Sequence, residues 1–246
     1  MQWKKNWLVA PAATLASIIM VTAVHAQPMS NMSQMHEPLV GAVLVDKFEY
    51  RAQDGQDVIA WEADAWYGGD YHKVWLKTKG EYSLSDAIES AEVQLLYSRL
   101  IDYYWDLQVG VRHDFEPDPS RSYGVIGLQG LAPGYFELDL QGFVSEQGDF
   151  TARFEAEYDL LITQRLILQP NAEITLAAQD VPELGLGGGI NDVELGLRLR
   201  YEFSRKFAPY VGVAWERKLG ETAILARSEG EDVDSLSLVA GVRFWF

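Results

Sequence analysis

The chain has 246 residues, of which 36 are acidic and 20 are basic, so its formal net charge is −16 at pH 7. So acidic a protein repels nucleic acid and attracts cations, and we expect no nucleic-acid partner. Cysteine is absent, which excludes disulfide bonds and thiolate metal sites.

The first 26 residues have the composition of a secretory signal peptide. Lys4 and Lys5 precede a largely apolar stretch at 7–24, and Val24-His25-Ala26 offers a small-residue cleavage site. Further along the chain, no segment has the roughly 20 consecutive apolar residues that a membrane-spanning helix needs. We therefore expect cleavage after Ala26, and a mature chain that leaves the cytoplasm without a helical anchor.

A polar arm at residues 27–38 follows the signal peptide and holds all the methionines of the expected mature chain. Met29, Met32 and Met35 stand three residues apart, and His36 comes next. Thioether sulfur is a soft ligand that suits Cu(I), and a neutral imidazole also binds copper. We expect these four side chains to bind copper as Cu(I). The alternative is a flexible arm that tolerates methionine and binds nothing.

From Leu39 onward, apolar and polar residues alternate with a period of two, which predicts β-strands. In VELGLRLRYEF, residues 193–203, every odd position is apolar or aromatic and most even positions are charged. Pro170 interrupts one expected strand and predicts a bulge there. The twelve expected strands are 39–50, 58–68, 71–82, 87–98, 103–115, 122–131, 135–146, 150–161, 164–177, 190–203, 207–218 and 235–246.

The connections between these strands alternate between tight turns and longer, charged or glycine-rich loops. Aromatic residues gather at the strand ends nearest the tight turns, as expected where rings sit at lipid headgroup level. The last expected strand ends on Phe246, which resembles the terminal signal of outer-membrane barrels. We therefore predict an all-β fold, a transmembrane antiparallel up-and-down β-barrel of about twelve strands at 39–246. Lipid would meet its outer face, and an acidic set of charges would line its lumen.

Two further histidines, His72 and His113, are candidate metal ligands on the barrel. Neither has a second imidazole at chelating spacing, so a structural, hydrogen-bonded histidine is the alternative for each. His113 and Ser122 flank one loop, which makes a hydrolytic Ser–His pair on the outer wall conceivable. Asp114 points to the lumen on this pattern and leaves that imidazole without an orienting carboxylate. The common hydrolase, phosphate-loop and zinc-helix motifs are absent, and we expect no catalytic site.

Seven extended stretches carry a resemblance to a known family. They are AWYGGDYHKVWLKTKGE, AEVQLLYSR, WDLQVGVRHDFEPDPSR, LQGLAPGYFELD, EAEYDLLITQRLILQPN, NDVELGLRLRYEFSRKFAPYVGVAWERKLGETA and ARSEGEDV. Together they resemble the copper resistance protein B family, outer-membrane proteins of Gram-negative bacteria, from about Val40 to Phe246.

The resemblance implies an outer-membrane barrel that contributes to copper resistance by sequestering or exporting copper, with its arm in the periplasm. It implies copper ions, outer-membrane lipids and a periplasmic multicopper oxidase as partners. Met29, Met32, Met35 and His36 match the ligand types of the family's arm, and His72 and His113 lie inside its barrel motifs. The alternatives are a general cation-conducting pore with no specific copper role, and a structural barrel whose link to copper is only genetic.

Overall fold

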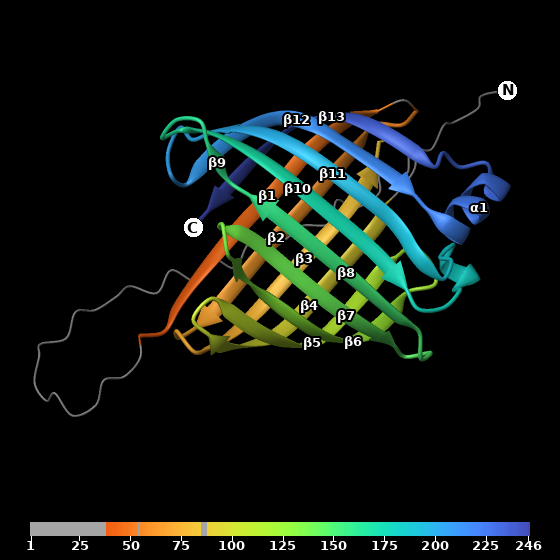
Figure 1. Cartoon of the computed structure of the whole chain (residues 1–246), viewed down its shortest axis with the longest axis horizontal. Helices are drawn as coiled ribbons and strands as arrows, with labels where there is room; N and C mark the ends of the chain where they lie inside the picture. Colours follow the sequence, from red (N-terminus) through yellow and green to blue (C-terminus); the bar gives the residue numbers. More distant parts are fainter. Residues whose placement is uncertain (1–37, 54, 85–87) are drawn as a thin grey trace, which may run out of the picture. The chain divides into compact units, whose positions relative to one another are not determined.

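The computed structural model describes residues 38–53, 55–84 and 88–246. The expected signal peptide, and with it Met29, Met32, Met35 and His36 of the arm, lie outside the described residues. The described part of the chain is built almost entirely from long, tilted strands (Figure 1). Within those ranges, no helix has the length and apolar composition to cross a bilayer.

Neighbouring strands pair antiparallel in chain order, and the last strand pairs with the first, which closes a barrel. The strands are β1 (Val40–Gln53), β2 (Val58–Gly68), β3 (His72–Ser83), β4 (Ile88–Asp102), β5 (Trp105–Glu116), β6 (Arg121–Ala132), β7 (Phe136–Ser145), β8 (Phe150–Tyr158), β9 (Leu160–Leu161), β10 (Leu166–Ala177), β11 (Gly189–Tyr201), β12 (Phe207–Lys218) and β13 (Asp234–Trp245). Because β8 and β9 are two pieces of one strand, the barrel has the twelve strands that the alternation predicts.

The prediction of a bulge at Pro170 is wrong. Strand β10 pairs with β11 in regular register through Pro170, which lies opposite Leu197, and the shift in that pairing comes later, at Thr175 and Leu176. On its other edge β10 pairs with β9 at Leu168 and with β8 from Asn171, with the same register before and after. A proline lacks the N–H that a ladder needs, so the interruption falls in the partner strand, between β8 and β9.

The loop at 219–234, predicted as irregular, instead contains a helix. Helix α1 (Gly220–Glu229) ends where Gly230 adopts a left-handed conformation with φ 85°. Its sequence ETAILARSE is rich in good helix formers between two glycines, so local propensity carries a signal that strand alternation does not. A short 3-10 helix, η1 (Pro182–Leu184), lies in the loop between β10 and β11. Figure 1 shows α1 at the end of the barrel opposite the C-terminus.

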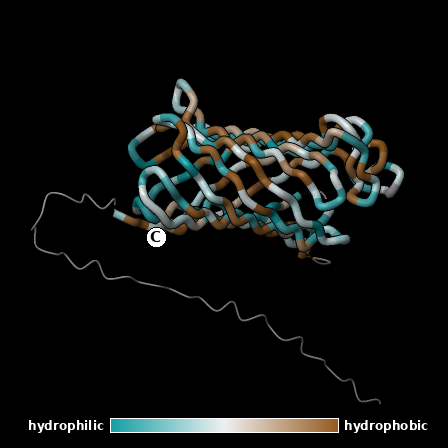
Figure 2. The backbone as a smooth tube through the Cα atoms, turned by 90° about the horizontal axis from the view of Figure 1, so that it is seen from below, coloured by the Kyte–Doolittle hydropathy of each residue, from teal (hydrophilic) through white to brown (hydrophobic). Residues whose placement is uncertain are grey.

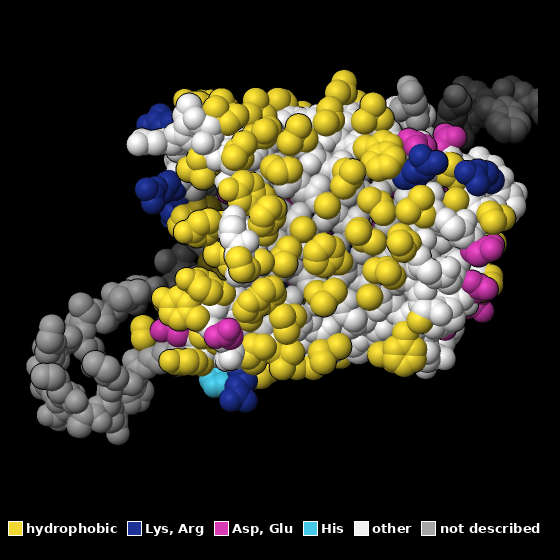
Figure 3. Space-filling view, viewed as in Figure 1, with side chains coloured by type: hydrophobic (Ala, Val, Ile, Leu, Met, Phe, Trp, Pro, Cys, Tyr) yellow, Lys and Arg dark blue, Asp and Glu magenta, His cyan; other side chains and the backbone are white. Residues whose placement is uncertain are grey.

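The two faces of each strand meet different surroundings, as the alternation predicts. On β11, Leu195, Leu197 and Leu199 point outward and are exposed, whereas Arg198 and Arg200 point inward and are buried. Hydrophobic side chains cover the visible wall, and charged ones gather near its two ends (Figure 3). Figure 2 shows the same alternation as changes along each strand between the colours of hydrophilic and hydrophobic residues. The outer face is hydrophobic and the interior is charged. This distribution is the reverse of that in a soluble barrel and fits a wall that faces lipid.

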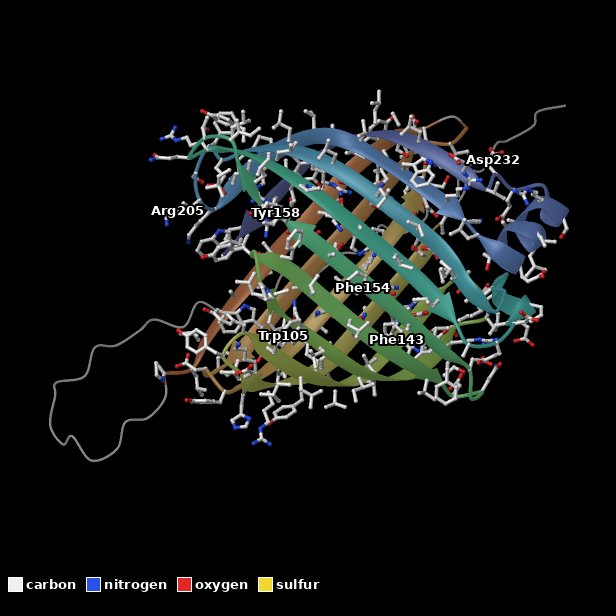
Figure 4. The ribbon with its side chains drawn as sticks, in the orientation of Figure 1. Trp105, Phe143, Phe154, Tyr158, Arg205 and Asp232 are labelled. Carbon is white, nitrogen blue, oxygen red and sulfur yellow. The ribbon has the colours of Figure 1, made fainter. Side chains whose placement is uncertain are left out.

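The two ends of the barrel differ. The tight connections lie at one end, which we call the turn end, and the longer loops with η1 and α1 lie at the other, the loop end. Figure 4 labels Arg205 at the turn end and Asp232 at the loop end. Large aromatic side chains project from the turn end, among them Tyr103, which is 82% exposed, and Tyr135. Exposed aromatic side chains are more numerous at the turn end, but Tyr50, Tyr82, Phe115 and Phe150 are exposed near the loop end, so the girdle is not confined to one end as predicted.

Candidate functional site

An ion-pair network centred on Glu49 lies inside the barrel, on the loop side of its middle. Glu49 of β1 is 1% exposed and accepts hydrogen bonds from Arg51 Nε at 2.8 Å and from Arg198 Nε and a terminal nitrogen at 2.9 and 2.8 Å. The Tyr210 hydroxyl donates a fourth bond at 3.0 Å. Arg51 also reaches Glu81 of β3 and Glu194 of β11, at 3.0 and 3.3 Å. These side chains come from β1, β3, β11 and β12, which belong to one run of neighbouring strands, so the network lines one half of the barrel interior. We call it the Glu49 network.

A second cluster fills the lumen beside β4, β5 and β8. Glu92 pairs with Arg112 and Arg153, each at 2.8 Å, and Arg112 also pairs with Asp114 at 2.6 Å. The Arg112 guanidinium lies over the Phe143 ring, 4.6 Å from its centroid, so apolar packing supports the ion pairs. Figure 4 labels Phe143 on β7. Together with the Glu49 network, these groups place buried ion pairs inside the barrel on the loop side of its middle.

Arg121 connects several segments at the loop end through ion pairs. Arg121 of β6 is 1% exposed and pairs with Asp149 at 2.7 Å and with Glu183 of η1 at 2.5 Å. Asp149 also accepts hydrogen bonds from the side chains of Gln179 and Ser145. The bond from Gln179, with those from Ser145 and Arg121, lowers the pKa of the Asp149 carboxyl from its usual value. Three loop-end segments are therefore held by one set of contacts.

Helix α1 is anchored to the same region. The Thr222 hydroxyl accepts hydrogen bonds from the Gly187 backbone N–H at 2.9 Å and from the Asn191 side chain at 2.8 Å. Asn191 is fully buried and donates a second bond to the Gly187 carbonyl. The helix thus fixes the β10–β11 loop against β11, and the loop end is an ordered cap.

Below the networks, a cavity of about 460 Å³ occupies the lumen from its middle to the turn end. It reaches Tyr104 in the β4–β5 turn and Glu137 at the start of β7. We call it the turn-end cavity. Its lining includes nine carboxylates and four cationic side chains: Asp46, Glu62, Asp64, Glu92, Asp106, Glu137, Asp139, Glu155 and Glu157, with Lys77, Lys79, Arg153 and Arg243. The predicted acidic lumen is therefore present, and hollow in one half.

His72 and His113 do not share a site. His72 starts β3 at the turn end, where its Nδ1 lies 2.6 Å from the Tyr97 hydroxyl and the two rings stack. His113 lies on β5 near the loop end, where its Nδ1 is 3.0 Å from Ser122 Oγ and its ring meets Phe115 edge-on. Across the described ranges, no group of three or more His, Asp and Glu side chains stands in an arrangement that holds a metal ion. Each of these histidines has the hydrogen-bonded environment of the structural alternative.

The Ser–His pair considered for hydrolysis does form a hydrogen bond on the outer wall. Asp114, however, points into the lumen and is bound by Arg112 at both carboxylate oxygens, as the alternation predicts. It is therefore directed away from His113. Glu146 lines the same hollow of the outer wall as His113 and Ser122, but within the described residues no carboxylate is hydrogen-bonded to that imidazole as in a catalytic triad.

Sequence reasoning placed Glu92, Arg112, Arg153 and Arg198 inside the barrel but missed three further buried charges. Glu49, Arg51 and Arg121 were not among the expected lumen charges, yet they are among the most buried groups of the barrel. The signal is present in KFEYR at 47–51, where Lys47, Glu49 and Arg51 alternate with Phe48 and Tyr50. Read with a period of two, that segment places all three charges inside.

Three comparisons with known proteins agree with this architecture. The family model described as copper resistance protein B precursor (CopB) matches residues 39–246. Copper resistance protein B of Escherichia coli is 45% identical over 204 residues, which cover 83% of this chain and 69% of the relative. A homolog of that protein in Pseudomonas syringae pv. tomato is 40% identical over 214 residues, covering 87% of this chain and 72% of the relative.

Solved structures support the fold alone. The NanC porin superposes with a TM-score of 0.53 at 13% identity, covering 83% of this chain and 99% of that one. The KdgM porin gives a TM-score of 0.50 at 10% identity, with the same coverage. Identities this low show a shared barrel and carry no statement about what passes through it.

Proposed function

The chain belongs to the copper resistance protein B family, and from that premise we propose that it binds copper at the outer membrane and contributes to copper resistance. The barrel supplies the membrane anchor. A non-enzymatic role is part of the proposal, since the relatives are named for resistance and the Ser–His pair lacks an orienting acid.

The observation that carries the copper assignment is where the soft ligands lie in the chain. Every methionine after the expected cleavage site falls at Met29, Met32 or Met35, and His36 follows them. The barrel segment at 39–246 contains neither methionine nor cysteine. Cu(I) prefers thioether and imidazole ligands to carboxylates. Thioethers and an imidazole cluster in the sequence of the arm, whereas the barrel imidazoles His72 and His113 do not share a site. We assign the arm as the Cu(I) site.

The arm joins the barrel at the turn end, because β1 starts there at Val40. Outer-membrane barrels have their short turns in the periplasm, so this connection supports a periplasmic arm. A periplasmic multicopper oxidase is the proposed protein partner on that side. The ion would then be bound before it reaches the lumen.

Buried ion pairs inside the barrel favour sequestration over free passage. Lys79 of β3 reaches Glu155 of β8 and Glu173 of β10 on the opposite side of the lumen, and Glu49, Arg198 and Arg121 are almost fully buried. A general cation pore needs a continuous aqueous path, as porins have. Only the acidic lining of the turn-end cavity favours the second candidate function, a general cation pore.

A tolerance assay tests the proposed function. A copper-sensitive strain that lacks its own family member would express the full chain, the variant M29I/M32I/M35I, or the matched arm control S30A/S33A. We expect the full chain and S30A/S33A to restore growth on copper equally, and M29I/M32I/M35I to lose most of that protection. Equal protection by all three, at equal amounts in the outer membrane, would remove the arm from the mechanism.

A further inference from the structure

The turn-end cavity holds carboxylates that its cations do not balance. Asp46, Glu92, Asp106 and Asp139 each pair with a lysine or arginine within 3.3 Å. Asp64 and Glu137 have no ion pair to any residue that the structure describes. The surplus negative charge is therefore assigned to particular side chains.

Glu155 and Glu157 each lie within reach of a lysine that is closer to a different carboxylate. Lys79 is 3.4 Å from Glu155 but 2.5 Å from Glu173. Lys47 is 3.8 Å from Glu157 but 2.8 Å from Glu62. Asp64, Glu137, Glu155 and Glu157 thus form an under-compensated set, which we call the surplus carboxylates.

The strand register adds to the imbalance. Glu137 of β7 lies directly opposite Glu157 of β8, and Asp139 lies directly opposite Glu155. Like charges directly opposite each other in an antiparallel pair destabilise the sheet. Here the repeated arrangement leaves a negative field in a space enclosed by a lipid-facing wall, where charge is screened less than in bulk water.

A buried polar group points to the same space. Gln94 is 3% exposed and lines the cavity. Its Nε2 donates to Glu92 and Gln141, while its Oε1 accepts no hydrogen bond from the described residues. A buried carbonyl oxygen without a donor costs free energy unless a cation or water meets it.

The atoms of the cavity lining that could ligate a metal ion include oxygens of carboxylates, amides and the backbone, and the lining contains no sulfur and no imidazole. Such a set suits hard and borderline divalent cations and gives Cu(I) no ligand that it prefers. Because no three groups of the described chain converge as a metal site, a cation held here keeps part of its water shell.

We propose that the turn-end cavity is a binding compartment for partly hydrated divalent cations, Cu²⁺ among them, and that Cu(I) does not bind in it. Entry is from the turn end, which the cavity reaches at Tyr104 and Glu137. The compartment goes beyond the proposed function by adding a second site, selective by charge and oxygen ligation, to the arm. The proposal for this compartment is independent of the proposal that the arm binds Cu(I).

The test measures Cu²⁺ binding calorimetrically on the full mature chain in detergent. All samples carry M29I/M32I/M35I/H36Q, so that the arm contributes no ligands. On this background, D64N/E137Q removes two surplus carboxylates without breaking an ion pair of the described residues. The matched control E221Q/D232N removes two exposed acids at the loop end. Heat-shifted migration in gels confirms that each barrel is folded, and E137Q alone, at the cavity mouth, serves as a milder variant.

We expect D64N/E137Q to weaken Cu²⁺ binding about tenfold, E137Q to weaken it less, and E221Q/D232N to leave it unchanged. Excess Mg²⁺ or Ca²⁺ should displace Cu²⁺, because ligation through retained water discriminates weakly between divalent ions. Ag⁺, a redox-stable substitute for Cu(I), should not compete. Equal affinity in D64N/E137Q and E221Q/D232N would overturn the compartment, as would competition by Ag⁺ at concentrations similar to Cu²⁺. Loss of arm-dependent copper tolerance would leave these outcomes unaffected.

Discussion

Replacing Glu49 with alanine tests whether the Glu49 network stabilises the barrel. The change removes the acceptor of four hydrogen bonds, one from Arg51, two from Arg198 and one from Tyr210. Removing one partner of a buried ion pair typically costs about 3–5 kcal/mol, because the other charge stays buried. Arg51 keeps Glu81 and Glu194, and Arg198 keeps the Asn171 side chain, which limits the loss.

We therefore expect Glu49→Ala to lower the free energy of unfolding by about 3 kcal/mol, at the lower end of that range. Glu49→Gln, whose amide oxygen can still accept from Arg198 and Tyr210, should cost about half as much. The assay is urea-induced unfolding of the barrel refolded into lipid vesicles, followed by tryptophan fluorescence. Glu221→Ala, an exposed loop-end change, is the control and should be neutral. A loss below about 0.5 kcal/mol for Glu49→Ala would refute the reasoning, since that is the size of an ordinary surface effect.

Three further predictions concern the wall, the loop end and the lumen. Gly110→Ala should destabilise the barrel by about 2 kcal/mol or more, because a Cβ at this position would lie 2.0 Å from the Leu95 carbonyl oxygen. Gly124→Ala is the control and should be neutral in the same unfolding assay, because a Cβ there would have no atom within 4 Å. The pKa of Asp149 is lowered first by the hydrogen bond from Gln179 and then by its contacts with Ser145 and Arg121. These contacts together contribute stability above the carboxyl's ordinary pKa and lose it as the pH falls through the lowered value. The destabilisation caused by Asp149→Asn should accordingly be constant near neutral pH and vanish in strong acid; a constant difference at all pH values would contradict stabilisation of the ionised carboxylate by these contacts. In planar bilayers the full chain should show no steady open-pore conductance in KCl, and a porin-sized conductance would restore the general cation pore.

The barrel could be predicted from sequence because its main signal is local. In the segment 193–203, each side chain's face follows from whether its position is odd or even, and the structure places Leu195 outside and Arg198 inside accordingly. The turn and loop pattern is equally local. Helix α1 was missed because one period-two pattern was applied to the whole region, although the stretch between Gly220 and Gly230 has helix-forming composition.

The ion pairs inside the lumen could not be predicted, because they join residues far apart in the chain. Glu49 and Arg198 are 149 positions apart, and Arg51 and Glu194 are 143 apart. Alternation gives the face of each charge but neither its height in the tilted barrel nor its partner across the lumen. Which carboxylates are left without a cation, such as Asp64, depends on that three-dimensional pairing.

A Cu(I) competition titration of the refolded mature protein, beside its M29I/M32I/M35I variant, tests the central claim most directly. The account predicts tight Cu(I) binding by the mature protein and loss of that binding in the variant, because the barrel offers no sulfur ligand. Unchanged Cu(I) affinity in the variant would contradict it, and would move the copper site from the arm to the barrel.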